Sequence, residues 1–240
     1  PKPPQKKPPL THFLCLPLVT STSRPQLERS LKQFRDDVTK IPEPQEASVE
    51  PIPEGATRPL GTLHLTLGVM SLTEQGRVEE AVELLKGLDL RGMLNEALRS
   101  AVAADKRESN GKAEGGERKD ASLTISLSSL SPMHSPKSTS ILYALPTDPT
   151  KRLYPFASTL QSAFTSAGFL LADDRPLKLH ATVVNTIYAA GGRRRDGNGG
   201  KRKKFFKIDA RDVLERYRGF AWAEDVRIER VAICKMGAKK

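Results

Sequence analysis

Two short stretches of this 240-residue chain place a histidine and a threonine two positions apart inside an otherwise apolar run. The first reads LHLTLGVM and contains His64 and Thr66, and the second reads LHATVV and contains His180 and Thr182. Because side chains alternate between the two faces of a strand, each pair shares one face while its leucine, alanine and valine neighbours occupy the other. Each stretch therefore predicts a half-buried strand that presents an imidazole and a hydroxyl together.

Two imidazoles brought face to face can divide a proton transfer between them. A neutral one takes a proton from an attacking water or hydroxyl, and a cationic one gives a proton to the leaving oxygen. Each threonine hydroxyl can donate to a non-bridging phosphate oxygen. The residues predict phosphodiester cleavage, with His64 and His180 as acid and base in either order and with Thr66 and Thr182 binding phosphate. The scheme needs no metal, and the other two histidines lack the spacing of metal ligands.

The elements that must position these residues repeat along the chain. Strand, helix and histidine-bearing strand follow one another over 11–72 and again over 138–188. Such a duplication predicts a pseudo-twofold axis that brings the two histidine strands together. The apolar patterns predict strands at 11–19, 61–72, 122–130, 138–146, 178–188 and 226–236, and helices around 27–38, 78–88, 94–101, 153–167 and 209–217.

Composition limits the class of protein. Apolar residues make up 38% and charged residues 28%, which is typical of a globular chain. No apolar run approaches the roughly 20 residues that a membrane span needs, so we expect no membrane partner. The predicted layout is a disordered Pro/Lys-rich tail at 1–10 and one domain of two pseudo-symmetric lobes at 11–240. Mobile insertions are predicted at about 41–58, 105–120 and 190–204.

The net charge of +11 is concentrated in the last of these insertions. Residues 191–207, which read GGRRRDGNGGKRKKFFK, contribute +7 of it. The segment could guide RNA to the site, because it follows the His180 strand, or act as a nuclear localisation signal, or be a solvated loop without a partner. The candidate nucleic-acid-binding residues are Arg193, Arg194, Arg195, Lys201, Arg202, Lys203 and Lys204.

Four further residues are candidates for the substrate cleft. Thr62 and Lys178 each precede a motif histidine by two positions and share its face. They could line the cleft or simply be polar residues at the end of a strand, and the sequence favours neither role. Phe13 and Tyr188 could stack on a nucleobase, although core packing is favoured for Phe13. Asn185 is expected to make a structural hydrogen bond.

The sequence around the two motifs resembles that of a known family. The pair HLTL and HATV resembles the 2H phosphoesterase superfamily. The stretches THFLCLPL, LHLTLGVMSL, ILYALP, KLHATVVNT and VRIERVAICKM resemble the A-kinase-anchor-protein-7-like phosphoesterase domain over roughly 11–240, most closely in its form in the activating signal cointegrator complex. The resemblance implies an α+β, bilobal, duplicated LigT-like fold in which two antiparallel sheets form a central cleft with helices outside.

The same resemblance implies a function. It implies metal-independent phosphodiester chemistry on RNA ends, cyclic phosphates or 2′-5′ linkages, without a cofactor and with RNA or a nucleotide as the substrate. His64 and His180 match the catalytic histidines, and Thr66 and Thr182 match the phosphate-binding hydroxyls. The alternative is a non-catalytic RNA-binding subunit of a nuclear complex. By itself the chain is expected to be a monomer.

Overall fold

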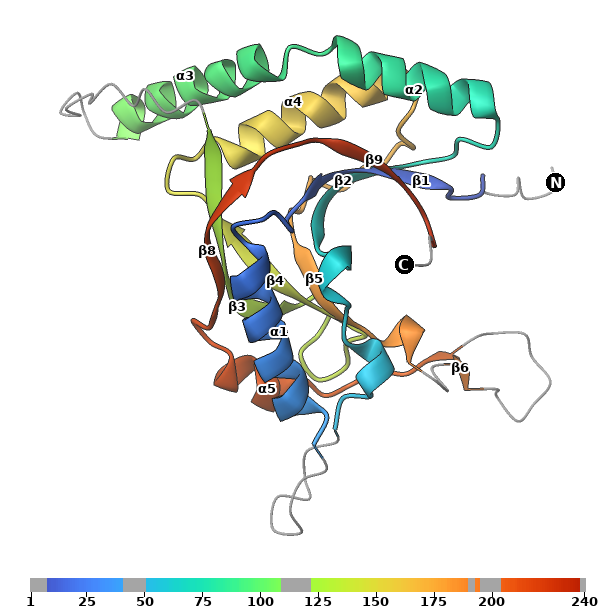
Figure 1. Cartoon of the computed structure of the whole chain (residues 1–240), viewed down its shortest axis with the longest axis vertical. Coiled ribbons are helices and arrows are strands. Elements are labelled where there is room, and N and C mark those ends of the chain that lie inside the picture. The colour runs from blue at the N-terminus through green and yellow to red at the C-terminus, as the bar shows by residue number, and fades with distance from the viewer. Residues whose placement is uncertain (1–7, 41–50, 109–121, 190–192, 195–203, 238–240) are drawn as a thin grey trace.

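The computed structural model describes residues 8–40, 51–108, 122–189, 193–194 and 204–237. These residues form a seven-stranded antiparallel sheet with helices outside it and a separate two-stranded ribbon (Figure 1), which confirms the predicted α+β class. The strands are β1 (His12–Pro17), β2 (His64–Met70), β3 (Leu123–Pro132), β4 (Ile141–Thr147), β5 (Ala181–Asn185), β6 (Arg193–Arg194), β7 (Lys204–Phe205), β8 (Ala221–Ile228) and β9 (Ala232–Lys235). The helices are α1 (Arg24–Val38), α2 (Gln75–Gly87), α3 (Leu90–Glu108), α4 (Leu153–Ser166) and α5 (Arg211–Arg216). Within the described part of the chain, no helix has the length and apolar character to cross a membrane.

The sheet is strongly curled. Its strands follow the order β8-β3-β4-β5-β2-β1-β9, yet the two edge strands β8 and β9 are consecutive in the chain and are joined only by residues 229–231. A flat sheet of this size would separate its edges by about 29 Å, whereas this link can span only about 14 Å. The sheet must therefore bend until its edges approach each other, and Figure 1 shows the resulting arc of β8 and β9.

Two groups of strands make up this sheet. One group contains β8, β3, β4 and β5, and the other contains β2, β1 and β9. They meet where β2 lies beside β5, at the single antiparallel pair of Leu65 with Ala181. The predicted two sheets are thus joined through the two histidine-bearing strands, which lie at the inner edge of each group.

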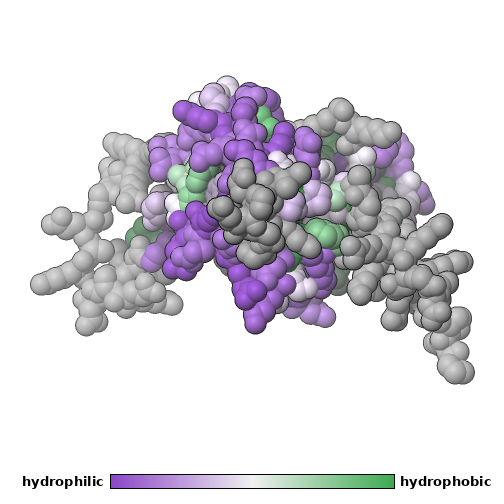
Figure 2. All heavy atoms as spheres, turned by 90° about the horizontal axis from the view of Figure 1, so that it is seen from below, coloured by the Kyte–Doolittle hydropathy of each residue, from purple (hydrophilic) through white to green (hydrophobic). Residues whose placement is uncertain are grey.

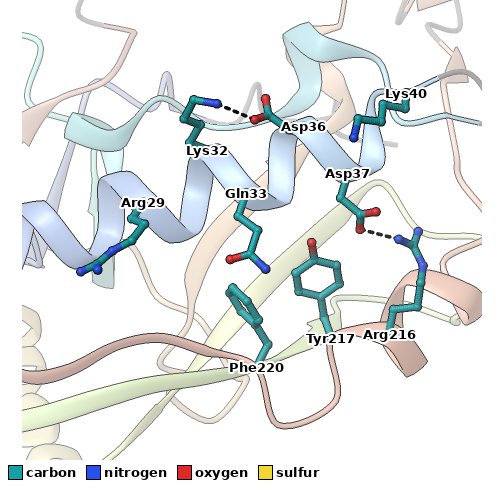
Figure 3. Close-up of a pocket in the computed structure, with 9 residues that line it drawn as sticks. All are labelled: Arg29, Lys32, Gln33, Asp36, Asp37, Lys40, Arg216, Tyr217 and Phe220. Atoms are coloured by element: carbon teal, nitrogen blue, oxygen red, sulfur yellow. Dashed lines mark hydrogen bonds and ion pairs between the residues drawn. The ribbon is translucent and has the colours of Figure 1, made fainter.

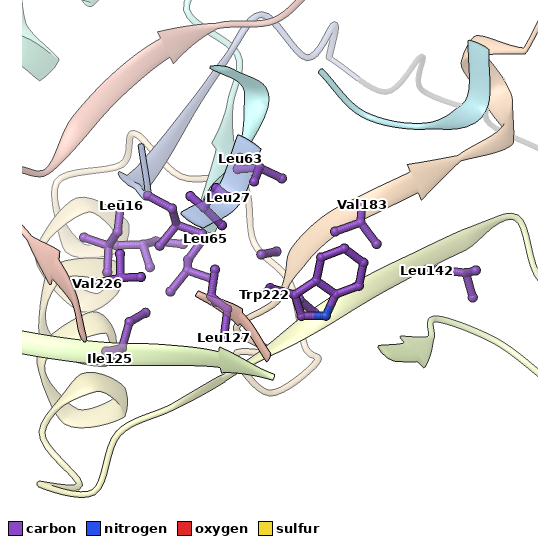
Figure 4. Close-up of a cluster of buried hydrophobic side chains, with 14 of the residues drawn as sticks. Leu16, Leu27, Leu63, Leu65, Ile125, Leu127, Leu142, Val183, Trp222 and Val226 are labelled. Atoms are coloured by element: carbon purple, nitrogen blue, oxygen red, sulfur yellow. The ribbon is translucent and has the colours of Figure 1, made fainter. Parts of the chain in front are cut away.

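One face of the sheet is buried beneath helices. α1 contacts β8, α4 contacts β2, and α3 contacts α4. Leu65 and Ala181 belong to this face and are fully buried, among the leucine, isoleucine and valine side chains shown in Figure 4. Each large apolar side chain buried in this way contributes about 1.5–3 kcal/mol to folding. The face seen in Figure 2 differs from this core, because the coloured residues there are mostly hydrophilic, with small hydrophobic patches between them.

Helix α1 also covers the open edge of the sheet. The Gln26 side chain accepts from the Glu224 N–H at 2.9 Å and donates to the Glu224 carbonyl at 3.0 Å, and Ser30 Oγ donates to the Trp222 carbonyl at 2.7 Å. These bonds satisfy backbone groups of β8 that would otherwise invite pairing with another strand. Under them, the Trp222 ring contacts the rings of Phe34 and Phe220 with centroids 5.2 and 5.0 Å apart.

Several predicted elements differ from the observed ones at their ends. The strand predicted at 226–236 is wrong, because residues 229–231 interrupt it and the chain crosses from one edge of the sheet to the other. Helix α3 extends to Glu108 and so includes the first residues of the insertion predicted from 105. The strand predicted at 61–72 begins with a short 3-10 helix, η3 (Leu60–Thr62). The strand predicted at 178–188 begins only at Ala181, so His180 lies one residue before it, and it is followed by another 3-10 helix, η4 (Thr186–Tyr188).

The predicted insertions fall largely outside the described residues. In the first of them, residues 51–58 are described and lie against the domain, with the short helix η2 (Glu54–Ala56) and the buried side chains of Ile52 and Ala56. The predicted tail at 1–10 is described only from residue 8.

Candidate active site

The register between β2 and β5 brings the two His-x-Thr motifs together. Leu65 is the partner of Ala181 in this antiparallel pair. His64 and Thr66 flank Leu65 on β2, and His180 (the residue just before β5) and Thr182 flank Ala181. All four side chains lie on the face opposite the buried Leu65 and Ala181, and all four are half-buried. Residues opposite one another in adjacent strands have Cβ atoms about 5 Å apart. We call this group of four residues the His–Thr site.

Both histidines make the same local hydrogen bond. His64 Nδ1 lies 2.7 Å from the Thr62 carbonyl oxygen, and His180 Nδ1 lies 2.7 Å from the Lys178 carbonyl oxygen. Because a carbonyl oxygen only accepts, each Nδ1 must carry the proton. In each neutral ring Nε2 is therefore the acceptor, as a general base requires. Thr62 and Lys178, which precede the histidines by two positions, thus each contact the histidine ring through a backbone carbonyl.

The two threonine hydroxyls are available to a ligand. Among the residues that the structure describes, no hydrogen bond engages Thr66 Oγ1 or Thr182 Oγ1. By contrast, the hydroxyl of Thr62 donates to the Pro59 carbonyl at 2.6 Å. Each available hydroxyl can donate to a phosphate oxygen held beside the two imidazoles.

An aromatic ring contacts each imidazole. Phe13 is stacked on His64, with centroids 4.7 Å apart and an interplanar angle of 29°. Tyr143, which lies opposite Thr182 on β4, meets His180 edge-on with centroids 5.2 Å apart. The sequence favoured core packing for Phe13, and that preference is wrong, because the ring is half-buried against the histidine. Tyr143 was not singled out, because its strand reads as an ordinary core strand.

The contact of Phe13 with His64 shows how the sheet bends. The β1 residue opposite His64 is Pro17, four positions from Phe13. Four residues of straight strand cover about 13 Å, which is too far for two rings whose centroids are 4.7 Å apart. The strands therefore bend toward the His–Thr site, helped by an irregular register between Leu14 and Cys15. The site lies on the concave side of this bend.

The electrostatic surroundings favour a neutral His180. Burial lowers the pKa of His180, and the nearby Lys178 ammonium lowers it further, while the hydrogen bond to the Lys178 carbonyl acts in the opposite direction. The ammonium itself lies 4.9 Å from the centroid of the Tyr143 ring. A histidine with a lowered pKa is deprotonated near neutral pH and so is suited to accept a proton.

Tyr188 lies beyond the far end of β5, in η4. Its ring is 57% exposed, and the Arg58 guanidinium carbon lies 4.0 Å from the ring centroid. Asn185 Oδ1 accepts from the Ile187 N–H at 3.1 Å, which confirms the predicted structural hydrogen bond. Arg58 was missed, because it follows a Pro-rich stretch that the sequence assigned to an insertion.

The structure places only part of the basic segment. Arg193, Arg194 and Lys204 lie in the β6–β7 ribbon, which follows η4, and the positions of their side chains are not described. The other candidates in this segment lie outside the described residues, and they are Arg195, Lys201, Arg202 and Lys203.

Two pockets differ in their relation to the site. One, of about 460 Å³, lies between β4, the start of α4 and the segment before His180, and is lined in part by Leu145, Tyr154, Lys178 and Leu179. Another, of about 670 Å³, lies between α1 and α5 and contains no residue of β2 or β5 (Figure 3). Four of its charged residues pair with one another, Lys32 with Asp36 and Arg216 with Asp37.

The comparisons with known proteins agree with the predicted resemblance to the A-kinase-anchor-protein-7-like domain. The sequence pattern of a family described as "AKAP7 2'5' RNA ligase-like domain" matches residues 10–240. A protein of Schizosaccharomyces pombe, named Uncharacterized protein C15D4.13c, is 27% identical over 227 residues, which are 94% of this chain and 86% of that protein.

Solved structures with a similar arrangement include bacterial proteins. The structure of E. coli LigT complexed with 3'-AMP has a TM-score of 0.46 and 14% identity, over 98% of this chain and 91% of that one. The protein TT0787 of Thermus thermophilus has a TM-score of 0.42 and 12% identity, over 93% and 87%. The family match spans almost the whole chain, and this protein therefore belongs to the family of AKAP7 2'5' RNA ligase-like domains.

Proposed function

We propose that this chain is a metal-independent phosphodiesterase of the 2H type, which acts on RNA ends, cyclic phosphates or 2′-5′ linkages. The observation that carries the proposal is the register of Leu65 with Ala181, because it sets two His-x-Thr motifs side by side on one concave face. The family description supports RNA as the class of substrate.

In this mechanism the two histidines have different roles. His180 Nε2 takes the proton from an attacking water or hydroxyl, whose oxygen forms the new bond to phosphorus. The opposite P–O bond breaks, and His64 Nε2 gives a proton to the leaving oxygen. The lowered pKa of His180 supports its assignment as the base.

The remaining residues of the site bind and position the phosphate. Thr66 and Thr182 donate hydrogen bonds to its non-bridging oxygens, where negative charge collects in the transition state. Phe13 holds the His64 ring by stacking, and the backbone carbonyls of Thr62 and Lys178 fix both imidazoles in one tautomer.

A product-resolved assay on a small panel tests this proposal. The panel contains 2′,3′-cyclic nucleotides, 2′-5′ oligoadenylate and RNAs with different 3′ ends, each incubated with the wild-type protein with and without EDTA. We expect one class of substrate to be cleaved, at the same rate with and without EDTA. If every substrate remains intact, or if EDTA abolishes cleavage, the proposed chemistry is wrong.

The pH dependence of cleavage gives a sharper prediction. As the base, His180 must be neutral, so kcat/KM should rise with pH through a midpoint below its usual value of 6.5. Lys178→Met removes a positive charge near His180, which should raise its pKa and move this midpoint up by roughly a few tenths of a unit. Lys178→Arg keeps the charge and serves as the matched control. A midpoint that is the same in all three proteins would reject His180 as the titrating base.

A non-catalytic role in RNA binding is the second candidate function. The +7 charge of residues 191–207 favours it, together with the resemblance to the domain of the cointegrator complex, which would place the chain in a nuclear assembly. This role predicts RNA binding that weakens steeply with salt and does not change in His64→Ala. Binding that requires both histidines but not the basic segment would reject it.

A further inference from the structure

Tyr188 and its neighbour Ile187 are exposed on a firmly held turn. The two side chains are 57% and 44% exposed. Between β5 and this turn, Thr186 is fully buried, its N–H donates to the Ser140 carbonyl at 2.9 Å, and its hydroxyl donates to the Phe206 carbonyl. A large ring that a rigid element holds in solvent is a feature typical of binding surfaces.

Arg58 covers one face of the Tyr188 ring. Its guanidinium carbon lies 4.0 Å from the Tyr188 centroid, and its own half-burial lowers the Arg58 pKa while leaving it a cation. The backbone N–H of Arg58 donates to the Val183 carbonyl at 2.8 Å, next to Thr182 on β5. The pair is therefore fixed to the same strand that carries half of the His–Thr site.

We propose that Arg58 and Tyr188 form a second nucleotide-binding site, which stacks a base and contacts a phosphate of single-stranded RNA leading away from the His–Thr site. This inference rests on the proposed RNA phosphodiester substrate. Thr182 and Asn185 lie three positions apart, about 10 Å along β5, and Tyr188 follows in η4, so a short oligonucleotide is long enough to reach from one site to the other. The β6–β7 ribbon, with Arg193, Arg194 and Lys204 in its sequence, follows η4 in the chain.

The chemistry of the pair suits a nucleotide better than a peptide. Every base has a π-face that can stack on the free face of the tyrosine ring, and the arginine on the opposite face can also reach a phosphate. An acidic peptide would satisfy the guanidinium but would leave the second face of the ring without a planar partner. The site is thus expected to increase affinity for longer strands rather than to select a base sequence.

The test measures how affinity depends on the length of RNA. The protein carries His64→Ala and His180→Ala, so that no substrate is cleaved, and fluorescence anisotropy reports its binding to a labelled RNA dinucleotide and octanucleotide. We expect the octanucleotide to bind more tightly, and Tyr188→Ala to weaken its binding by about tenfold or more. Tyr188→Phe keeps the ring and should keep the affinity. Val102→Ala, which trims another exposed apolar side chain on α3, is the control and should bind as its parent does.

The possible results separate this inference from the proposed catalysis. Equal octanucleotide affinities for the parent and Tyr188→Ala would overturn the inference, even if the wild-type enzyme cleaves RNA. Binding of a labelled polyglutamate peptide that depends on Tyr188, without a matching effect on RNA, would also overturn it in favour of a protein partner. RNA binding that depends on Tyr188, together with a wild-type protein that cleaves no substrate of the panel, would support this site and reject the proposed catalysis. Circular dichroism of each variant shows that the fold is retained.

Discussion

Replacing His180 with alanine should reduce kcat by about a hundred- to ten-thousand-fold, and His64→Ala should do the same. In the proposed mechanism each change removes one end of the proton transfer, because Nε2 of His180 would receive a proton and Nε2 of His64 would supply one. The double variant should lose little more than either single variant, since groups that act in one step do not contribute additively. Initial rates on the best substrate of the panel measure all three losses.

Two further variants separate lost chemistry from lost structure. His180→Asn can keep a donor to the Lys178 carbonyl, 2.7 Å from Nδ1 in the parent protein, but it has no group in place of Nε2. It should therefore be as inactive as His180→Ala and still bind phosphate. His134→Ala changes an exposed histidine in the β3–β4 connection and should keep full activity. A His180→Ala protein that retains more than about a tenth of the wild-type rate would contradict its role as the base, given the usual size of this effect.

The sequence groups the residues of the His–Thr site by a local signal. Alternation along each strand is enough to place His64 with Thr66, and His180 with Thr182, on one face. The duplication then predicts that the two strands come together, and the structure pairs them through Leu65 and Ala181. The duplication does not predict the register between β2 and β5. This register depends on how the two groups of strands pack, which involves residues more than a hundred positions apart.

Other parts of the site depend on bending that no local pattern reports. Phe13 reaches His64 only because β1 and β2 curve, and a short stretch that reads as a core strand carries no sign of that curve. Arg58 meets Tyr188 across 130 positions of sequence, from a segment whose prolines indicate only that it is neither helix nor strand. The division of 226–236 into β8 and β9 likewise follows from the closure of the sheet, because both parts have strand-like composition.

Removing the Trp222 side chain should destabilise the fold by about 3–5 kcal/mol, a large share of the 5–15 kcal/mol typical of a folded domain. Trp222 is 1% exposed, and its indole N–H donates to the Ser129 carbonyl at 2.6 Å. Trp222→Ala leaves a cavity among the rings of Phe34, Tyr217 and Phe220 and leaves that carbonyl without its donor. Urea unfolding followed by circular dichroism measures the loss, since the variant lacks the only tryptophan of the chain.

The position of Trp222 determines what the variant should keep. The ring joins α1 to β8 at one edge of the sheet, whereas the His–Thr site lies at the junction of β2 and β5. Trp222→Ala protein that remains folded at low temperature should therefore cleave at the wild-type rate per folded molecule. Trp222→Phe refills part of the cavity and should recover part of the lost stability. If Trp222→Ala instead lowered kcat while the unfolding midpoint stayed unchanged, the β8 edge of the sheet would be coupled to the β2–β5 junction, and α1 would help to shape the site.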